Sequence, residues 1–209
     1  MTLSKDPINL IITGVGGQGN ILASQLTATA AIGEGFYASI GETYGASQRG
    51  GSVMSHVRFS REFQYGPLIP SGEADLILGF EPLETLRVLV DYGNDSTQVI
   101  FNPRPNYPIS VLSGQQKYPP VEELLTRIKQ LAASARVVKA TELASELGAL
   151  VAQNVIMVGA LAGSGFLPVP LAAFEQAIAG VFDDEKKRDF NLKAFNLGVR
   201  GYREAVELR

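Results

Sequence analysis

The chain has 209 residues, of which 45% are hydrophobic and 19% are charged, and its formal net charge is -3. Such a chain can bury the core of one large domain, and its scattered Lys and Arg residues form no basic stripe for nucleic acid. Because it contains no cysteine and a single histidine, we exclude disulfides, thiol nucleophiles, thiolate-bound iron–sulfur clusters and multi-histidine metal sites.

The first elements follow an order typical of α/β proteins. Residues 1–7 lead into an apolar run that is too short for a signal sequence or a membrane span, so we expect a cytoplasmic protein without membrane contact. This run predicts a buried strand over residues 8–13. The helical spacing of the apolar residues that follow predicts a helix over residues 20–35, and a second strand is expected over residues 36–40. The β-α-β order predicts a Rossmann-like, doubly wound and mainly parallel sheet.

The same alternation continues through the middle of the chain. Residues 41–51 are polar and glycine-rich and are expected to form a loop between two strands, while prolines make residues 102–120 an extended excursion. The further predicted strands cover residues 52–60, 74–79, 98–101 and 136–140. The predicted helices between them cover residues 81–93, 121–135 and 141–148.

The last third of the chain is predicted to be helical. Residues 151–165 are apolar nearly all round, which implies burial in the core or under a partner. Residues 168–182 read as an amphipathic helix, and residues 184–209 read as a partly interrupted surface helix. We find no repeat and no linker, so residues 1–209 are expected to form a single domain.

A glycine-rich turn follows the first predicted strand and opens the first predicted helix. It matches the pattern G-x-G-x-x-G, in which glycines permit a tight turn and a close approach of the backbone to a phosphate or to a neighbouring strand. Its residues are Gly14, Gly16, Gly17, Gln18 and Gly19. The motif alone leaves two interpretations open, an anion or dinucleotide site and a turn that only packs helix on strand.

An acidic residue about 20 positions after the glycines would support a nicotinamide dinucleotide, because it would bind the ribose hydroxyls. Glu34 precedes the second strand and Glu42 lies late, so the dinucleotide interpretation is weakened. Glu42 either takes the ribose hydroxyls or orients the loop that it begins.

That second loop is dense in glycines, hydroxyls, an amide and a guanidinium, a composition typical of binding loops. Arg49 beside two glycines can hold a phosphate or carboxylate through two hydrogen bonds, or it is simply solvated or structural. The residues expected to take part in binding are Ser47, Gln48, Arg49, Gly50, Gly51 and Ser52. His56, in the strand that follows, either acts as an acid or base or forms a structural hydrogen bond. Gln153 and Asn154 either cap the apolar helix that they begin or contact a partner.

Taken together, these segments resemble the gamma domain of 2-oxoacid:ferredoxin oxidoreductases. The resemblance covers nearly the whole chain, and the form SQRGGSVMSHVR is closest to the small subunit of the indolepyruvate type. The segments that carry it are GVGGQG, ETYGASQRGGSVMSHVR, LIPSGEADLILGFEPLETLR, VIFNPRP, NVIMVGALA and NLKAFNLG.

The resemblance implies a subunit of an enzyme that oxidatively decarboxylates a 2-oxoacid to an acyl-coenzyme A and passes the electrons to ferredoxin. Thiamine diphosphate, Mg²⁺ and iron–sulfur clusters would belong to a larger partner subunit, because this chain has neither the cysteines nor a GDG…N segment. This chain would carry no catalytic residue, cover the active site and help to bind coenzyme A. A stand-alone NAD(P)-dependent dehydrogenase and a purely structural subunit remain the alternatives.

Overall fold

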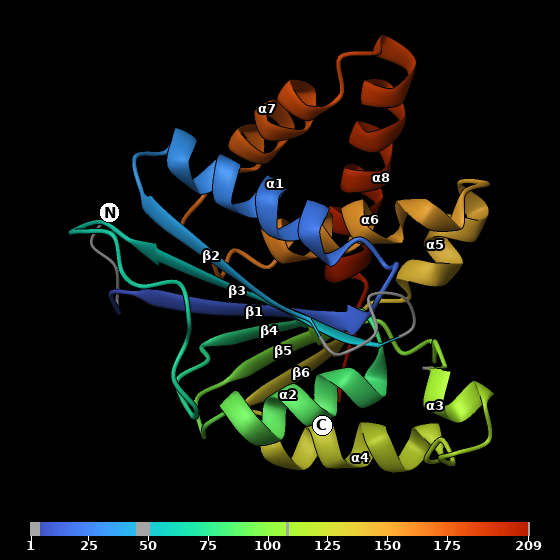
Figure 1. The fold of residues 1–209 in the computed structure, drawn as a ribbon. Coiled ribbons are helices and arrows are strands. Elements are labelled where there is room, and N and C mark those ends of the chain that lie inside the picture. Colours follow the sequence, from blue (N-terminus) through green and yellow to red (C-terminus); the bar gives the residue numbers. More distant parts are fainter. Residues whose placement is uncertain (1–4, 45–50, 108, 209) are drawn as a thin grey trace.

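A computed structural model describes residues 5–44, 51–107 and 109–208 (Figure 1). It is an α/β domain with one seven-stranded sheet in the order β2-β3-β1-β4-β5-β6-β7. The strands are β1 (Ile8–Val15), β2 (Tyr37–Tyr44), β3 (Ser52–Ser60), β4 (Leu76–Gly79), β5 (Gln98–Phe101), β6 (Ser134–Val137) and β7 (Val206–Glu207). The helices are α1 (Asn20–Gly33), α2 (Pro82–Tyr92), α3 (Ile109–Leu112), α4 (Val121–Leu131), α5 (Ala140–Glu146), the 3₁₀ turn η1 (Leu150–Ala152), α6 (Gln153–Gly163), α7 (Leu171–Val181) and α8 (Glu185–Arg203).

The sheet is mixed and mostly parallel, which confirms the predicted fold class. Strands β1, β4, β5 and β6 are parallel neighbours. Strand β3, however, is antiparallel to both β1 and β2 and lies between them, so β1 and β2 run parallel to one another without pairing directly. The connection between β2 and β3 spans only residues 45–51, which is shorter than the dozen or more residues that a parallel crossover requires, so these two strands pair antiparallel.

Helices cover both faces of the sheet. Helices α1 and α5 to α8 lie over one face, and α2 and α4 lie over the other (Figure 1). The chain thus leaves β1 toward one face and β4 toward the other, although the two strands are neighbours. Such a switch point, at the carboxyl ends of parallel strands, is where open α/β sheets bind ligands.

Helices α6 and α8 pack backbone to backbone. A Cβ atom on Gly159 would lie 2.0 Å from the Phe195 carbonyl oxygen, and one on Gly198 would lie 1.9 Å from that of Ile156. The apolar α6 is therefore buried in the domain's own core, the first of the two predicted possibilities. Helix α8 runs uninterrupted from Glu185 to Arg203 and buries Phe195, which corrects the expectation of an interrupted surface helix.

Several element boundaries differ from those predicted. Strand β2 extends to Tyr44, so the expected loop from residue 41 begins inside a strand. Helix α4 ends at Leu131 and β6 starts at Ser134, earlier than predicted, because Ser134 and Ala135 pair with Gln98 and Val99 of β5 and this pairing overrides the helical preference of alanine. The excursion over residues 102–120 contains the short helix α3, and β7 was not predicted at all. In the described part of the chain, no helix combines the length and the apolar character needed to cross a membrane.

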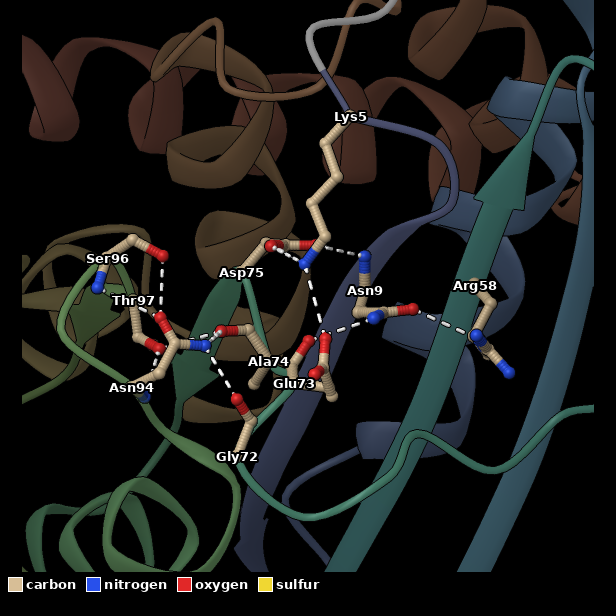
Figure 2. Close-up of polar contacts among 10 residues, drawn as sticks. All are labelled: Lys5, Asn9, Arg58, Gly72, Glu73, Ala74, Asp75, Asn94, Ser96 and Thr97. Carbon is tan, nitrogen blue, oxygen red and sulfur yellow. Dashed lines mark hydrogen bonds and ion pairs between the residues drawn. The ribbon is translucent and has the colours of Figure 1, made fainter.

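Polar side chains at the amino edge of the sheet pair with one another (Figure 2). The Asp75 carboxylate accepts hydrogen bonds from Lys5 Nζ at 2.6 Å and from the Asn9 backbone N–H at 2.8 Å. The Asn9 amide donates to the Glu73 carbonyl at 2.9 Å and accepts from Arg58 Nε at 3.0 Å. This edge is built from the starts of β1 and β4 and the end of β3, and the Asn9 amide and both Asp75 carboxylate oxygens have partners there.

Candidate functional site at the carboxyl edge

The glycine turn joins β1 to α1, and its glycines are required for different reasons. Gly17 and Gly19 have φ angles of 105° and 85°, which disfavour side chains. A Cβ on Gly19 would also lie 2.2 Å from Asn154 Nδ2, and one on Gly14 would lie 2.7 Å from Gln18 Oε1. A Cβ on Gly17 would meet no atom within 4 Å. Side chains at Gly14 and Gly19 would therefore clash with neighbouring residues, whereas Gly17 faces open space.

Gln18 holds the turn to the sheet. Its Oε1 accepts a hydrogen bond from the Val15 N–H at 2.7 Å, and its Nε2 donates to the Phe80 carbonyl at 3.0 Å. Val15 ends β1 and Phe80 follows β4, so this buried side chain closes the crevice at the switch point. The Gln18 side chain therefore bridges the two strand ends, directly before the start of α1.

Two backbone amides of the turn are already engaged. Gly16 N–H donates to the Gly51 carbonyl at 2.8 Å, and Gln18 N–H donates to the Val15 carbonyl at 3.2 Å. Helix α1 starts after Gly19 without a hydrogen-bonding side-chain cap. The N–H groups of its first turn have no intrahelical acceptor, so they offer hydrogen bonds and partial positive charge to a ligand.

A cavity of about 450 Å³ lies over this first turn. Its volume lies within the range usual for small-molecule sites. It is lined by Gly16, Gly17, Gly19, Asn20, Ile21, Glu42 and Val53. The structure therefore brings the glycine turn and Glu42 together in one cavity, although they are far apart in the sequence.

Glu42 is fixed by two hydroxyl groups. Ser24 Oγ in α1 donates to one carboxylate oxygen at 2.9 Å, and Ser55 Oγ in β3 donates to the other at 2.6 Å. These bonds hold β2 to its neighbours and leave the carboxylate with accepting capacity on the cavity wall. Because β3 separates β1 from β2, Glu42 is displaced from the usual position of a ribose-binding acid, which lies on the strand beside β1.

Asn20 is a cavity residue that the sequence reasoning missed. It is the first residue of α1 and is only 4% exposed. Among the described residues, neither its Oδ1 nor its Nδ2 has a hydrogen-bond partner. The signal in the sequence is an amide directly after the last glycine of the turn, but its missing partners become visible only in three dimensions.

The second predicted loop is described only at its end. Ser47, Gln48, Arg49 and Gly50 lie outside the described residues. Gly51 reaches the glycine turn through its carbonyl, which accepts from Gly16, and Ser52 begins β3 opposite Val15. The two loops named by the sequence analysis therefore meet at the carboxyl edge.

The lone histidine is a buried structural residue. His56 is 2% exposed, its Nδ1 accepts a hydrogen bond from the Ile69 N–H at 3.3 Å, and its ring meets that of Tyr92 edge-on. Burial, and then the nearby Arg58 charge, lower the pKa of His56 below 6.5, so its ring is neutral at physiological pH. This agrees with the hydrogen-bonding interpretation and removes His56 from the cavity.

Gln153 and Asn154 face the same edge from α6. Gln153 Oε1 accepts from the Thr141 hydroxyl at 3.3 Å, and Asn154 Oδ1 accepts from the Val155 N–H at 2.8 Å. Asn154 also packs against Gly19. They therefore contribute to local hydrogen bonding and packing, and Asn154 satisfies an amide of the first turn of α6.

A buried carboxylate after β4 was also missed. Glu81 is fully buried, caps α2 by accepting the Glu84 N–H at 2.8 Å, and accepts a hydrogen bond from the Tyr118 hydroxyl. Burial raises the pKa of Glu81 above its usual 4.5, and burial together with the hydrogen bond to Glu81 raises the pKa of Tyr118.

Over the described residues, no three His, Cys, Asp or Glu side chains converge as metal ligands.

A family model and individual relatives place this chain in the same family. Residues 9–201 match the family described as pyruvate ferredoxin/flavodoxin oxidoreductase. The indolepyruvate oxidoreductase subunit IorB of Thermococcus kodakarensis is 37% identical over 96% of this chain and 98% of its own length. The subunit of the same name from Archaeoglobus fulgidus is 38% identical over 97% of both chains.

Solved structures share the fold. A 2-oxoglutarate:ferredoxin oxidoreductase from Magnetococcus marinus, with 2-oxoglutarate, coenzyme A and succinyl-CoA bound, matches 98% of this chain and 32% of its own at a TM-score of 0.75 and 20% identity. The gamma subunit of a keto/oxoacid ferredoxin oxidoreductase from Geobacter sulfurreducens matches 94% of this chain and 99% of its own, with a TM-score of 0.68 and 22% identity.

Proposed function

The chain belongs to the pyruvate ferredoxin/flavodoxin oxidoreductase family, and we propose that it is the small subunit of a cytoplasmic enzyme that oxidises indolepyruvate or a related arylpyruvate. Its similarity to the IorB subunits over almost the full length supports this assignment. The reaction converts the 2-oxoacid to carbon dioxide and an acyl-coenzyme A, and its electrons pass to ferredoxin.

The redox chemistry belongs to a larger partner subunit. Thiamine diphosphate with Mg²⁺ supplies the decarboxylation there, and iron–sulfur clusters supply the path for electrons. This chain has no cysteine for a cluster. Its own contribution is to cover the active site and to position coenzyme A.

We place coenzyme A in the cavity over α1. The observation that carries this assignment is that the uncapped first turn of α1, the open face at Gly17 and Glu42 line a single cavity of about 450 Å³. The Magnetococcus marinus enzyme, which shares the fold, was solved with coenzyme A bound. Arg49, from the loop that ends beside the turn, is proposed to bind a coenzyme A phosphate through its planar guanidinium.

The partner is proposed to dock on the same edge. Ile21 lines the cavity over the glycine turn and is 44% exposed, and Leu150 of η1 lines a second cavity with Gln18 and is 60% exposed. Exposed apolar side chains around a ligand cavity are typical of a surface that another subunit covers.

Purification of the native complex tests the function. The chain is expected to copurify with a larger, cysteine-rich, thiamine-binding subunit, and the complex is expected to reduce ferredoxin with indolepyruvate only when coenzyme A is present. The isolated chain should have no visible absorbance and should not oxidise 2-oxoacids. Copurification with a subunit that lacks thiamine diphosphate, or activity without coenzyme A, would contradict the proposal.

A nicotinamide-dependent dehydrogenase is the second candidate, and the glycine turn is the observation that favours it. The insertion of β3 between β1 and β2 argues against it, because the ribose-binding acid normally lies on the strand beside β1. Isothermal titration of the chain with NAD and NADP separates the two, since micromolar binding of either would replace our proposal. A purely structural subunit would bind neither these dinucleotides nor coenzyme A.

A further inference from the structure

The amide of Asn20 is buried beside the cavity without a partner. The side chain is 4% exposed, and within the described ranges both its Oδ1 and its Nδ2 lack a hydrogen bond. A buried polar atom without a partner destabilises the folded state, so native proteins rarely leave both ends of an amide unpaired. Asn9, at the opposite edge, is equally buried and has both ends paired.

The surroundings of Asn20 restrict what can pair with it. Its Nδ2 needs an acceptor and its Oδ1 needs a donor. A fully ionised phosphate supplies acceptors only, so it would leave Oδ1 unpaired. The Glu42 carboxylate on the wall of the same cavity also disfavours a purely anionic ligand. A neutral group that both donates and accepts, such as an amide or a purine edge, satisfies both atoms.

The cavity is also longer than a single small anion. Glu42 is held by Ser24, which lies four residues beyond Asn20 in α1. Four residues of α-helix rise by about 6 Å, so the first-turn amides and the Glu42 carboxylate are separated by roughly one helical turn. A ligand can therefore contact both the first-turn amides and the Asn20 side chain at one end of the cavity and still extend toward Glu42 at the other.

We propose that Asn20 is the specificity-determining residue of this cavity and that it pairs with a neutral donor-and-acceptor group of the ligand. The inference rests on the proposed function, in which that ligand is coenzyme A. Coenzyme A carries such groups in two places, the amides of its pantetheine arm and the edge of its adenine. Asn20 thus binds the neutral part, while the backbone of the first turn of α1 binds an anionic part.

This role has a signature that a structural asparagine does not share. Replacing Asn20 by Ala removes two unpaired buried atoms, so Asn20→Ala is expected to raise the melting temperature of the ligand-free chain by about 2–4 °C. The same variant is expected to weaken coenzyme A binding about tenfold. The matched control Asn9→Ala is expected to lower the melting temperature and leave binding unchanged.

Calorimetric titration and thermal melting of the full-length chain test the proposal with four probes: coenzyme A, 4′-phosphopantetheine, adenosine 3′,5′-bisphosphate and pyrophosphate. Asn20→Ala should lose affinity for coenzyme A and for one of the two fragments, which identifies whether an amide or the adenine is bound. Its affinity for pyrophosphate should match that of the wild type.

Three other outcomes overturn it. A lower melting temperature for ligand-free Asn20→Ala would show that Asn20 has a structural partner. Unchanged coenzyme A affinity in a variant of raised melting temperature would refute the recognition role while leaving the proposed function intact. If the wild-type chain binds neither coenzyme A nor either fragment, coenzyme A placement in the proposed function fails, and this inference fails with it.

Discussion

The two edges of the sheet contain similar kinds of residues and use them differently. At the amino edge, Lys5, Asn9 and Asp75 pair with one another and with neighbouring backbone (Figure 2). At the carboxyl edge, the first turn of α1 is uncapped, and the buried amide of Asn20 has no partner among the described residues. Polar composition alone therefore does not distinguish a structural cluster from a binding site. What distinguishes Asn20 from Asn9 is that neither end of its amide is paired within the described residues.

The largest expected effect separates the two kinds of glycine in the turn. Gly19→Ala combines a φ of 85° with a Cβ placed 2.2 Å from Asn154 Nδ2, so we expect a loss of about 2–5 kcal/mol in unfolding free energy. Gly17→Ala meets only the conformational penalty, about 1–2 kcal/mol, since its Cβ contacts nothing within 4 Å. Urea denaturation of both variants measures the difference, and equal losses would show that the packing of Asn154 does not constrain the turn.

Substitutions at the amino edge should change the stability of the chain but not its ligand binding. Asp75→Ala leaves the Asn9 N–H without its acceptor and releases Lys5, so a loss of about 2–3 kcal/mol in unfolding free energy is expected. Coenzyme A affinity, measured by titration below the unfolding transition, should not change. A variant that remains stable but binds coenzyme A poorly would reverse the assignment of the two edges.

Substitution of Arg49 should change the use of coenzyme A but not the assembly of the subunits. Arg49→Lys removes the planar pair of donors that binds a phosphate, so the apparent KM for coenzyme A in the reconstituted complex should rise. The ratio of the two KM values should correspond to a free-energy difference of about 1.5–3 kcal/mol. Subunit assembly, followed by size-exclusion chromatography, should be unaffected. Weakened assembly with unchanged coenzyme A kinetics at saturating subunit would instead indicate a structural role.

The smallest effect concerns the pH dependence of stability at the carboxyl edge. Because the pKa of Glu81 is raised above 4.5 in the folded chain, the folded state holds its proton more tightly than the unfolded state. Glu81 therefore destabilises the fold increasingly as the pH rises from about 4.5 toward the folded pKa. Glu81→Gln does not titrate, so its stability relative to the wild type should increase over that interval, by at most about 1.4 kcal/mol per pH unit.

Denaturation of wild type and Glu81→Gln at a series of pH values checks this. A constant difference across the series would mean that Glu81 titrates alike in both states.

Local patterns predicted most of the elements and the glycine turn. The apolar run of β1 and the helical spacing of α1 are signals within a few residues, and they place Gly14 to Gly19 correctly at a strand–helix junction. The insertion of β3 could not be predicted from them, because pairing between β1 and β3 depends on contacts between residues 37 to 51 positions apart.

The candidate site was predicted only in part for a similar reason. Gly17 and Glu42 were named from sequence, and the structure brings them into one cavity. Gln18 was named as a ligand contact but turns inward to Val15 and Phe80. Asn20 was not named, because an amide after a glycine looks the same in the sequence whether or not its hydrogen bonds are made. Such a distinction requires the tertiary surroundings.

The close contact between α6 and α8 limits how this chain can vary. Because backbone meets backbone at Gly159 and Gly198, any side chain at either position forces the two helices apart. Helix α6 begins beside the glycine turn, where Asn154 rests against Gly19, so a displaced α6 disturbs that turn. Substitutions in this family should therefore accumulate on the exposed side of α8, while Gly198, far from the cavity in sequence, should tolerate almost none.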